Sequence, residues 1–356
     1  MRVLVALSGG VDSSVAAGLL KDEGHEVVGA TMKLWGGASD SGCCSVADVV
    51  DARRVADRLG IDHHVFNFTE EFDAHVVRPY VKAHEAGLTP NPCIECNRHL
   101  KFRSFLDRGM RLGFDAVATG HHARVVRAPD GGDAGAVVSR LLRGADEGKD
   151  QSYVLSCLTA AELDRLLLPI GDMTKPVVRE IAAKLGLPTA AKPDSQDVCF
   201  VLGGSGTSAR RQFLEERLTL HAGEAVDAET GKVVGIVAAV ELVTVGQRRG
   251  IGVAAGSRQF ATRVDVARRR VEVGSEEDLL DSGVLLSSRT WVHGPLPVGS
   301  SVLAQASAHG RTWGAIVTDD GLLYESPRRR IAPGQTVALY LGDEVIGSGI
   351  VRGQAA

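Results

Sequence analysis

The chain has 356 residues, of which 44% are hydrophobic and 24% are charged. These proportions belong to a globular protein of two or three domains, and they exclude a disordered tail, a fibrous protein and a small disulfide-linked scaffold. The net charge of −4 at pH 7 argues against a strongly basic nucleic-acid binder, although arginines gather locally, as at Arg248–Arg249 and Arg328–Arg330.

The six cysteines are expected to serve as thiols, ligands or redox partners. No apolar run reaches the roughly 18 residues that a membrane span requires. The first residues lead directly into a predicted buried strand, with no secretory leader. We therefore expect a cytoplasmic protein, a setting in which structural disulfides are uncommon.

Short apolar runs alternate with amphipathic segments over the first 200 residues. This alternation predicts an α/β domain with a parallel sheet and crossover helices. A β-hairpin with a glycine-rich turn is expected over 124–144. The expected strands cover 3–7, 27–32, 63–68 and 116–121, and the expected helices cover 12–24, 45–60, 97–112, 159–168 and 175–186.

The helical period fades after residue 200. Residues 203–211 read GGSGTSARR, a small and flexible composition that is typical of a loop or domain boundary. Beyond them, short β-rich runs with glycine turns predict a small antiparallel barrel or sandwich. These runs cover 233–246, 268–274, 301–310 and 336–342.

The strongest chemical signal is the run Ser8–Ser14, SGGVDSS, which lies between the first strand and the first helix. Glycines let the backbone approach an anion closely, and the helix N-terminus adds the positive end of its dipole. The run has neither the GxxxxGKS/T pattern of a kinase-type NTPase nor the GxGxxG pattern of a Rossmann site. It resembles the PP-loop of ATP pyrophosphatases, which implies cleavage of ATP between its α and β phosphates with Mg²⁺ present.

Two residues at the ends of neighbouring strands are expected beside this loop. Met32 ends the second strand, and Gly120 ends the strand that precedes His121. Ligands of parallel sheets bind at the carboxyl ends of the strands, so both residues are candidates for nucleotide contact. A glycine in this position would permit the nucleotide to approach the backbone closely.

The second signal is the run Thr89–Asn97, TPNPCIECN. The two prolines of this run stiffen the chain before the cysteines. Asn97 is predicted to cap the helix that follows. Cys96 would then lie at a helix N-terminus, where the pKa of a thiol is lowered. The basic helix beyond it suits an anionic polymer. The Cys93–Cys96 pair also fits a redox pair or half of a metal site, although Cys43–Cys44, adjacent cysteines, would make a poor second half.

Cys199 lies in the run 192–200, KPDSQDVCF. Taken alone it predicts a buried thiol, the commonest state of a cysteine. Together with an adenylating loop and Cys96, it completes the parts needed to replace an oxygen by sulfur. Adenylation makes a carbonyl oxygen a leaving group, and a persulfide supplies the nucleophile.

Motifs along nearly the whole chain resemble those of the bacterial tRNA-specific 2-thiouridylases, the MnmA family. They read SGGVDSS, ATMKLW, GCCS, TPNPCIECN, KF, ATGHHA, GKDQSYVL, DSQDVCF, VGQRRGIG and IAPGQTVALY, in the family's order and approximate spacing. The resemblance implies ATP-dependent 2-thiolation of the wobble uridine, position 34, of tRNA. Its partners would be tRNA and a cysteine desulfurase or sulfur-relay protein as sulfur donor.

The same resemblance implies a division into three parts. A PP-loop catalytic domain would cover 1–202, a central β-rich linker domain 203–270, and a C-terminal antiparallel β-barrel that contacts tRNA 271–356. It further implies that a Cys96–Cys199 disulfide remains after each turnover and must be reduced.

The site residues follow from the resemblance position by position. Cys96 corresponds to the nucleophile and Cys199 to the persulfide carrier, and Asp12 is the expected partner of Mg²⁺ or the triphosphate; no resident metal site is assigned. The ATP contacts would be Ala6, Leu7, Ser8, Gly9, Gly10, Val11, Asp12, Ser13, Met32 and Gly120. The tRNA contacts would be Asn91, Pro92 and Cys93 at the target base, together with His121, Lys149, Asp150, Gln151, His309 and Gln335.

The sequence departs from the family pattern at two places. Many relatives read NPD where this chain has Asn91-Pro92-Cys93. A thiol, with an ordinary pKa of about 8.5, cannot serve identically to that carboxylate as an acid or base. Cys93, Cys96 and Cys199 would instead be able to hold an iron–sulfur cluster, which stands as an alternative. In the barrel, the run 307–310 replaces an Arg-Tyr type of tRNA contact, and His309 is the residue we assign in its place.

Two other classes of function fit parts of the sequence. The first is another PP-loop adenylating enzyme, such as a tRNA 4-thiouridine synthase or an amidotransferase-like ligase, but neither explains the barrel together with both cysteine runs. The second is an RNA-binding or metal-sensing protein whose loop has lost catalysis. Release of pyrophosphate on adding ATP, Mg²⁺ and tRNA distinguishes an enzyme from a binding protein.

Overall fold

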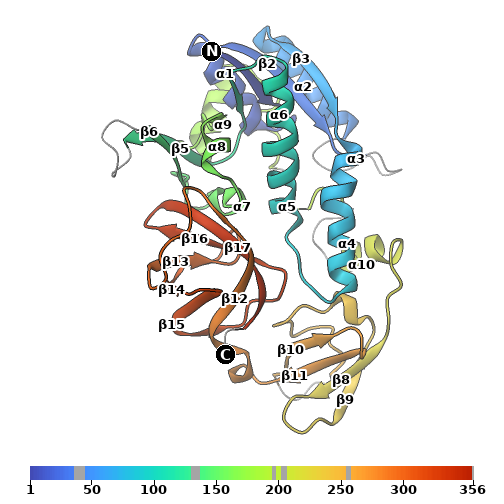
Figure 1. Ribbon diagram of the computed structural model, residues 1–356. Coiled ribbons are helices and arrows are strands. Elements are labelled where there is room, and N and C mark those ends of the chain that lie inside the picture. The colour runs from blue at the N-terminus through green and yellow to red at the C-terminus, as the bar shows by residue number, and fades with distance from the viewer. Residues whose placement is uncertain (36–44, 130–136, 195–197, 202–206, 254–257, 355–356) are drawn as a thin grey trace.

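The computed structural model describes residues 1–35, 45–129, 137–194, 198–201, 207–253 and 258–354. The chain forms three parts (Figure 1). An α/β part carries both the N-terminus and two long helices that descend from it. A barrel and a smaller sheet lie at the lower ends of those helices. None of the helices within these ranges is both long and apolar enough to cross a membrane.

The α/β part is built on a five-stranded parallel sheet. Its strand order is β3-β2-β1-β4-β7. After Arg2, the residues of β1, VLVA, form a continuous apolar run because helices cover both faces of the sheet. The strands are β1 (Arg2–Ala6), β2 (Glu26–Lys33), β3 (Asp62–Asn67), β4 (Ala116–Ala118) and β7 (Leu166–Leu167).

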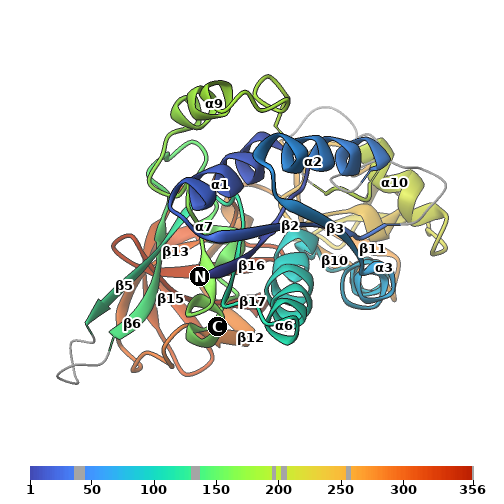
Figure 2. The same ribbon diagram turned by 90° about the horizontal axis from the view of Figure 1, so that it is seen from above.

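Helices cover both faces of this sheet (Figure 2). α1 (Val11–Asp22) and α2 (Val46–Leu59) lie along one face, and their buried side chains form a common core with α9 (Lys175–Lys184). α2 begins with a capping box between Ser45 and Asp48, which satisfies backbone donors at its first turn.

The other face is covered by two long helices that contain π-helical segments. The first runs through α3 (Thr69–Phe72), η1 (Asp73–Val77) and α4 (Arg78–Glu85). The second runs through α5 (Pro92–Glu95), η2 (Cys96–Ser104) and α6 (Phe105–Arg111). π-helical segments are rare and frequently accompany functional sites.

The prediction that Asn97 caps the second long helix is wrong. Asn91 is the cap, and its side chain accepts a hydrogen bond from the backbone N–H of Cys93 at 3.1 Å. Pro92 suits the first helical position because it has no N–H to leave unsatisfied. Cys93 therefore lies in the first turn of this helix. Cys96, which we expected at the N-terminus, lies one turn further along.

The predicted hairpin is present as β5 (Ala123–Pro129) and β6 (Val137–Arg143), which pair antiparallel. The glycine-rich turn that we expected at its tip lies outside the described residues. Short helices follow at α7 (Ser152–Leu155) and α8 (Ala160–Leu163). The helix expected over 159–168 ends early because Leu166–Leu167 pair with β4 and complete the parallel sheet.

The central part begins with α10 (Thr207–Glu215) and contains a four-stranded sheet in the order β10-β11-β8-β9. The expected β-rich run 233–246 is a strand only as far as Val237, and a 3-10 turn, η3 (Val240–Leu242), follows. The loop residues 203–206 are not among those described. The strands are β8 (Gly223–Asp227), β9 (Val233–Val237), β10 (Phe260–Asp265) and β11 (Arg270–Gly274).

The C-terminal part is a closed six-stranded antiparallel barrel, so the sandwich alternative is excluded. The ring β12-β15-β14-β13-β16-β17 closes through the pairing of β12 with β17. A 3-10 turn, η4 (Glu277–Leu279), leads into it. The strands are β12 (Leu280–Trp291), β13 (Ser301–Gln305), β14 (Trp313–Val317), β15 (Gly321–Arg329), β16 (Thr336–Leu341) and β17 (Glu344–Gln354).

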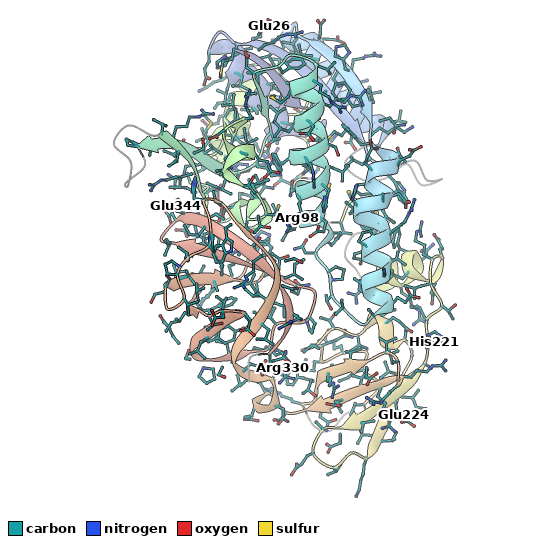
Figure 3. The ribbon with its side chains drawn as sticks, viewed as in Figure 1. Glu26, Arg98, His221, Glu224, Arg330 and Glu344 are labelled. Atoms are coloured by element: carbon teal, nitrogen blue, oxygen red, sulfur yellow. The ribbon has the colours of Figure 1, made fainter. Side chains whose placement is uncertain are left out.

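Polar contacts fasten the barrel to both other parts. Strand β6 of the α/β part pairs with β17, next to an Arg140–Glu344 ion pair of 3.3 Å. Arg330 lies where the barrel meets the central sheet (Figure 3). Its guanidinium binds Asp281 at 3.0 Å and donates to the carbonyl of Thr262 at 2.8 Å. These contacts fix the barrel's position relative to the α/β part and the central sheet.

Candidate active site

A cavity of about 380 Å³ opens at the carboxyl ends of β1, β2 and β4. This is the place where ligands of open parallel sheets bind. The cavity brings together most of the residues that the sequence predicted. They are Ala6, Leu7, Ser8, Gly10, Val11, Asp12, Ser13, Met32, Pro92, Cys93, Cys96, Gly120, His121, Lys149, Asp150, Gln151, Cys199 and His309. Gly9, Asn91 and Gln335 do not line it.

The loop Ser8–Gly10 forms one wall and has the features of an anion-binding turn. Gly10 precedes α1 and offers no side-chain cap to the donors of the first turn. The hydroxyl of Ser13 accepts a hydrogen bond from the N–H of Ser8 at 3.2 Å, which holds the loop against the helix. Gly9 has a φ of 70°, and a Cβ there would lie 2.4 Å from the carbonyl oxygen of Asp48. The uncapped helix N-terminus fits a phosphate group.

Gly120 packs directly on this loop. A Cβ added to Gly120 would lie 2.4 Å from the backbone nitrogen of Ser13 and 2.5 Å from the carbonyl carbon of Asp12. The glycine is therefore needed for the close packing of β4's end against the start of α1, in addition to any nucleotide contact.

Gly120→Ala is expected to disrupt the loop. A backbone clash cannot be relieved by a side-chain movement, so we expect a loss of about 1–3 kcal/mol in the free energy of unfolding. Thermal unfolding and ATP-binding measurements on the purified variant check this. Gly353→Ala, where a Cβ would meet nothing within 4 Å, is the matched control. Unchanged stability and ATP binding in Gly120→Ala would contradict the assigned packing.

A network of charges connects this loop to the start of α9 and to the segment that leads to Cys199. Lys175 places its amine 2.7 Å from each carboxylate oxygen of Asp12 and 2.9 Å from Asp194. Asp194 also binds Lys149 at 2.7 Å and Arg179 at 2.9 Å. The carboxylate of Asp194, five residues before Cys199, thus connects Lys149 with Lys175 and, through Lys175, with Asp12.

The carboxylate of Asp12 stays charged within this network. Burial by itself would raise the pKa of Asp12, but the hydrogen bonds of His122 and Lys175 outweigh it and hold the pKa below its ordinary value. His122 contributes through Nε2, which lies 3.3 Å from Asp12 Oδ1. Asp12 therefore offers a fixed negative group at the start of α1, as a partner of Mg²⁺ must.

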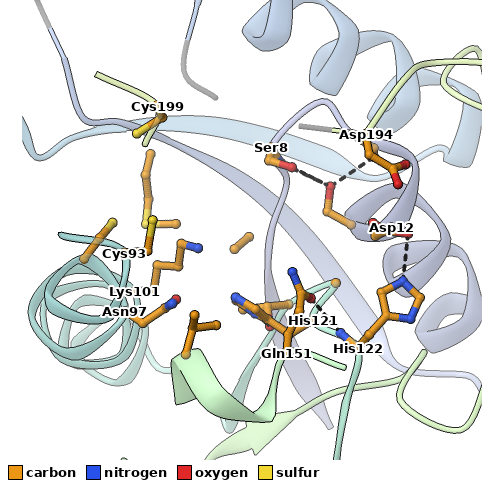
Figure 4. A pocket seen from close by; sticks show the side chains of 18 of the residues that line it. Ser8, Asp12, Cys93, Asn97, Lys101, His121, His122, Gln151, Asp194 and Cys199 are labelled. Carbon is orange, nitrogen blue, oxygen red and sulfur yellow. Dashed lines mark hydrogen bonds and ion pairs between the residues drawn. The ribbon is translucent and has the colours of Figure 1, made fainter. Parts of the chain in front are cut away.

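The thiols of Cys93 and Cys199 lie on the side of the cavity opposite Ser8 and Asp12 (Figure 4), and Cys96 also lines the cavity. No disulfide joins the cysteines of the described ranges. The residue before Cys199, Val198, has a φ of 53°, a left-handed conformation that is rare for a β-branched residue. Such strain is concentrated at functional sites and costs about 1–3 kcal/mol.

The remaining cysteines lie elsewhere or outside the description. Cys157 is fully buried, and burial raises the pKa of its thiol to about 12, so it stays protonated. Cys43 and Cys44 are not among the described residues. Within the described ranges, no group of three or more His, Cys, Asp or Glu side chains is arranged to hold a metal ion. The three cavity thiols, as they stand, do not fit an iron–sulfur cluster.

Some of the predicted tRNA residues present side chains to the cavity, and others use their polar groups in hydrogen bonds within the chain. Lys149 and His309 line the cavity, and burial keeps the pKa of His121 well below its ordinary value, so its imidazole is neutral. The carboxylate of Asp150 is already used in hydrogen bonds within the chain. It accepts them from Arg143, Ser152 and the backbone of Gly144.

Gln151, Asn91 and Gln335 hold backbone segments in place. Gln151 accepts from the N–H of His122 at 2.8 Å. Asn91 caps α5, and Gln335 of the barrel donates to the carbonyl of Thr89 at 2.7 Å, outside the cavity. This hydrogen bond holds the barrel against Thr89, the first residue of the run that contains Cys93 and Cys96.

Three family models match the chain in succession. The model described as tRNA methyl transferase HUP domain matches residues 1–203, the tRNA methyl transferase PRC-barrel domain matches 211–275, and the aminomethyltransferase beta-barrel domain matches 321–351. The tRNA-specific 2-thiouridylase MnmA of Chloroflexus aurantiacus is 44% identical over 366 residues, which cover 100% of this chain and 99% of that protein. The chain belongs to the MnmA family.

Two further members give the same result. The tRNA-specific 2-thiouridylase MnmA of Roseiflexus castenholzii is 42% identical over 98% of both chains. That of Mycolicibacterium paratuberculosis is 43% identical over 99% of both. The resemblance drawn from the motifs is confirmed, and it extends along the whole length of the chain.

Within the MnmA family fold, the cavity also contains residues that the sequence reasoning missed. Lys175 and Asp194 were not singled out, although a lysine at the first position of a helix is an unfavourable place for a cation. Gln305, which lies outside the lining of the cavity, was missed as well. Its buried amide donates to the carbonyls of Ser307 and Ala308, and this fixes the barrel loop that carries His309. The burial of Lys175 and Gln305 and the ion pairs of Asp194 are visible only in three dimensions.

Proposed function

We propose that this chain catalyses ATP-dependent 2-thiolation of the wobble uridine of tRNA. The observation that carries the proposal is one cavity that has an anion-binding loop on one wall, the thiols of Cys93 and Cys199 on the opposite wall, and Cys96 in its lining. Membership of the MnmA family supports the same reaction, since the relatives are named tRNA-specific 2-thiouridylases. An adenylating loop and thiols in one cavity are the two parts that oxygen-to-sulfur exchange requires.

The first step is activation of the O2 oxygen of uracil by ATP, with release of pyrophosphate. The backbone of Ser8–Gly10 and the N-terminus of α1 hold the phosphates. Asp12 is the carboxylate placed to meet Mg²⁺, which would supply charge neutralisation on the phosphates. Lys175 holds Asp12 in position and adds a positive charge to the same wall. An anticodon-loop base leaves its stack more cheaply than a duplex base, which lets the cavity receive it.

The second step transfers sulfur from a persulfide on Cys199. In one route the terminal sulfur attacks C2, AMP leaves, and the Cys96 thiolate then attacks the Sγ of Cys199 and frees the thiocarbonyl. In the other, Cys96 attacks that Sγ first and releases hydrosulfide, which attacks C2 and displaces AMP. Both routes end with 2-thiouridine, AMP and a Cys96–Cys199 disulfide that an external thiol reduces.

The three parts of the chain divide this work. The catalytic part, 1–202, activates the base, and the barrel, 271–356, contacts tRNA through His309, with Gln335 fixing it to the catalytic part. Residues 203–270 join the two. Lys149, with its amine on Asp194, is placed to exchange that partner for an RNA phosphate.

The test is an assay with purified protein, tRNA transcript, ATP, Mg²⁺, and a cysteine desulfurase with cysteine as sulfur source. We expect pyrophosphate, AMP and 2-thiouridine in equal amounts, the nucleoside being identified by mass spectrometry of the hydrolysed tRNA. Release of ADP would contradict the proposed cleavage of ATP. Formation of 4-thiouridine would favour the other PP-loop enzyme, and tRNA binding without pyrophosphate would indicate a binding protein.

A further inference from the structure

Asn97 is a buried polar residue of the cavity wall that the proposed chemistry does not use. It is only 3% exposed, and its Oδ1 is buried with no hydrogen-bond partner. A buried amide with a purely structural role is normally paired, because an unsatisfied polar atom costs about 1–3 kcal/mol. An unpaired acceptor in a cavity wall is explained by a ligand that brings the donor.

The position of Asn97 on its helix brings it among the reactive groups. It follows Cys96 directly, and it lies four residues after Cys93 and four before Lys101, whose side chains all line the cavity. Residues four apart share a face of a helix. Figure 4 shows the Asn97 side chain on the thiol side of the cavity, across from Ser8 and Asp12.

A uracil bound between these two walls has a defined orientation. Its O2 oxygen must face the ATP loop for activation, so the opposite part of its Watson–Crick edge faces the thiol wall. That edge carries one donor, N3–H, and one acceptor, O4. An asparagine amide offers the complementary pair, with an acceptor at Oδ1 and a donor at Nδ2.

We propose that Asn97 anchors the target uracil by accepting a hydrogen bond from N3–H at Oδ1 and donating one from Nδ2 to O4. The inference rests on the proposed function and deepens it by naming a residue that binds the base. The proposed role of Asn97 is to hold the N3–H and O4 groups of the uracil in place. Selection against cytosine needs further contacts, because the amide can turn over and present the same two groups in reverse order.

The test compares anticodon stem-loop RNAs that carry uridine or 3-methyluridine at the wobble position. The methyl group removes the N3–H donor and would collide with Oδ1. Binding is measured by fluorescence anisotropy without ATP, for the full-length protein and for Asn97→Ala. We expect the wild-type protein to prefer uridine by about tenfold or more, and Asn97→Ala to bind both loops within about threefold, since it lacks the acceptor and leaves room for the methyl group.

Asn67→Ala is the matched control, because Asn67 is exposed at the end of β3 and its side chain accepts hydrogen bonds from Thr69, away from the cavity. This control should keep the full preference for uridine. Thermal unfolding checks that Asn97→Ala folds, and Asn97→Ser serves as a second variant with the same expectation. An equal preference in wild type and both Asn97 variants would overturn the proposal.

The outcome for Asn97 is separable from the outcome for the proposed function. If 2-thiouridine forms but the penalty of the methyl group is unchanged by Asn97→Ala, the base-binding assignment alone fails. If the wild-type protein forms no 2-thiouridine under the conditions given above and shows no preference between the loops, the proposed function fails with it.

Discussion

Cys199→Ser is expected to abolish formation of 2-thiouridine while pyrophosphate release continues. The serine hydroxyl cannot carry a persulfide, but the ATP loop lies on the opposite wall of the cavity and keeps its contacts. Removal of a covalent nucleophile costs on the order of 10³-fold or more in rate. The two products are measured in the same reaction, thionucleoside by mass spectrometry and pyrophosphate by release of label from ATP.

Cys157→Ala provides the matched control for this experiment. Cys157 is buried outside the cavity, with a thiol that donates to backbone carbonyls and a pKa raised by burial. Its replacement should leave thiolation intact apart from a small loss of stability. Thiolation by Cys199→Ser at the normal rate would refute the persulfide assignment. Recovery of its activity with added sulfide, in place of the desulfurase, would support the hydrosulfide route.

The predictions that succeeded at this site rest on local signals. SGGVDSS joins a strand to a helix, and each of its features acts within a few residues. The ends of β2 and β4 were placed beside it by the rule for parallel sheets, and Met32 and Gly120 do line the cavity. Local motifs and a regular topology are therefore sufficient to find this wall of the cavity.

The predictions that failed depended on tertiary contacts or on a choice between similar local signals. Asn91 and Asn97 are both good helix caps, and the proline after Asn91 decides between them. Leu166–Leu167 belong to an amphipathic pattern, yet they form a strand because β4 offers a free edge. Pairing with a distant segment overrides local propensity here.

The charge network could not be predicted from the sequence, because it too depends on tertiary contacts. Lys175 lies 163 residues from Asp12, and no periodic pattern connects two side chains at that separation. The cysteine run and the motifs that matched the MnmA family identified the reactive thiols. They did not identify the side chains that surround those thiols in the cavity. Asn97 was singled out only as a cap, since its burial without a partner is a property of the folded cavity.

Asp12→Ala is expected to abolish pyrophosphate release, and thiolation with it. The carboxylate is the only one in the SGGVDSS loop, and its loss removes the group placed to meet Mg²⁺. It also leaves the amine of Lys175, whose side chain is 10% exposed, with Asp194 as its remaining carboxylate. Asp22→Ala, an exposed change at the other end of α1, is the matched control and should keep full activity.

The sign of the pH dependence follows from the pKa of Asp12. Because the folded pKa lies below the ordinary value of 3.8, the ionised carboxylate stabilises the fold above that value. This stabilisation is lost as the pH falls from 3.8 toward the folded pKa. Wild-type protein should therefore lose stability in acid more steeply than Asp12→Asn, as followed by thermal unfolding from pH 6 to about pH 3.

Separating catalysis from structure decides what Asp12 does. Asp12→Asn keeps the shape of the side chain and accepts one hydrogen bond from Lys175, but it has no charge for Mg²⁺. If it folds with near-normal thermal stability at pH 7 and still releases no pyrophosphate, the carboxylate acts in the reaction. If both Asp12 variants release pyrophosphate at more than about a tenth of the wild-type rate, Asp12 only holds Lys175 in place, and the partner of Mg²⁺ must be sought elsewhere in the cavity.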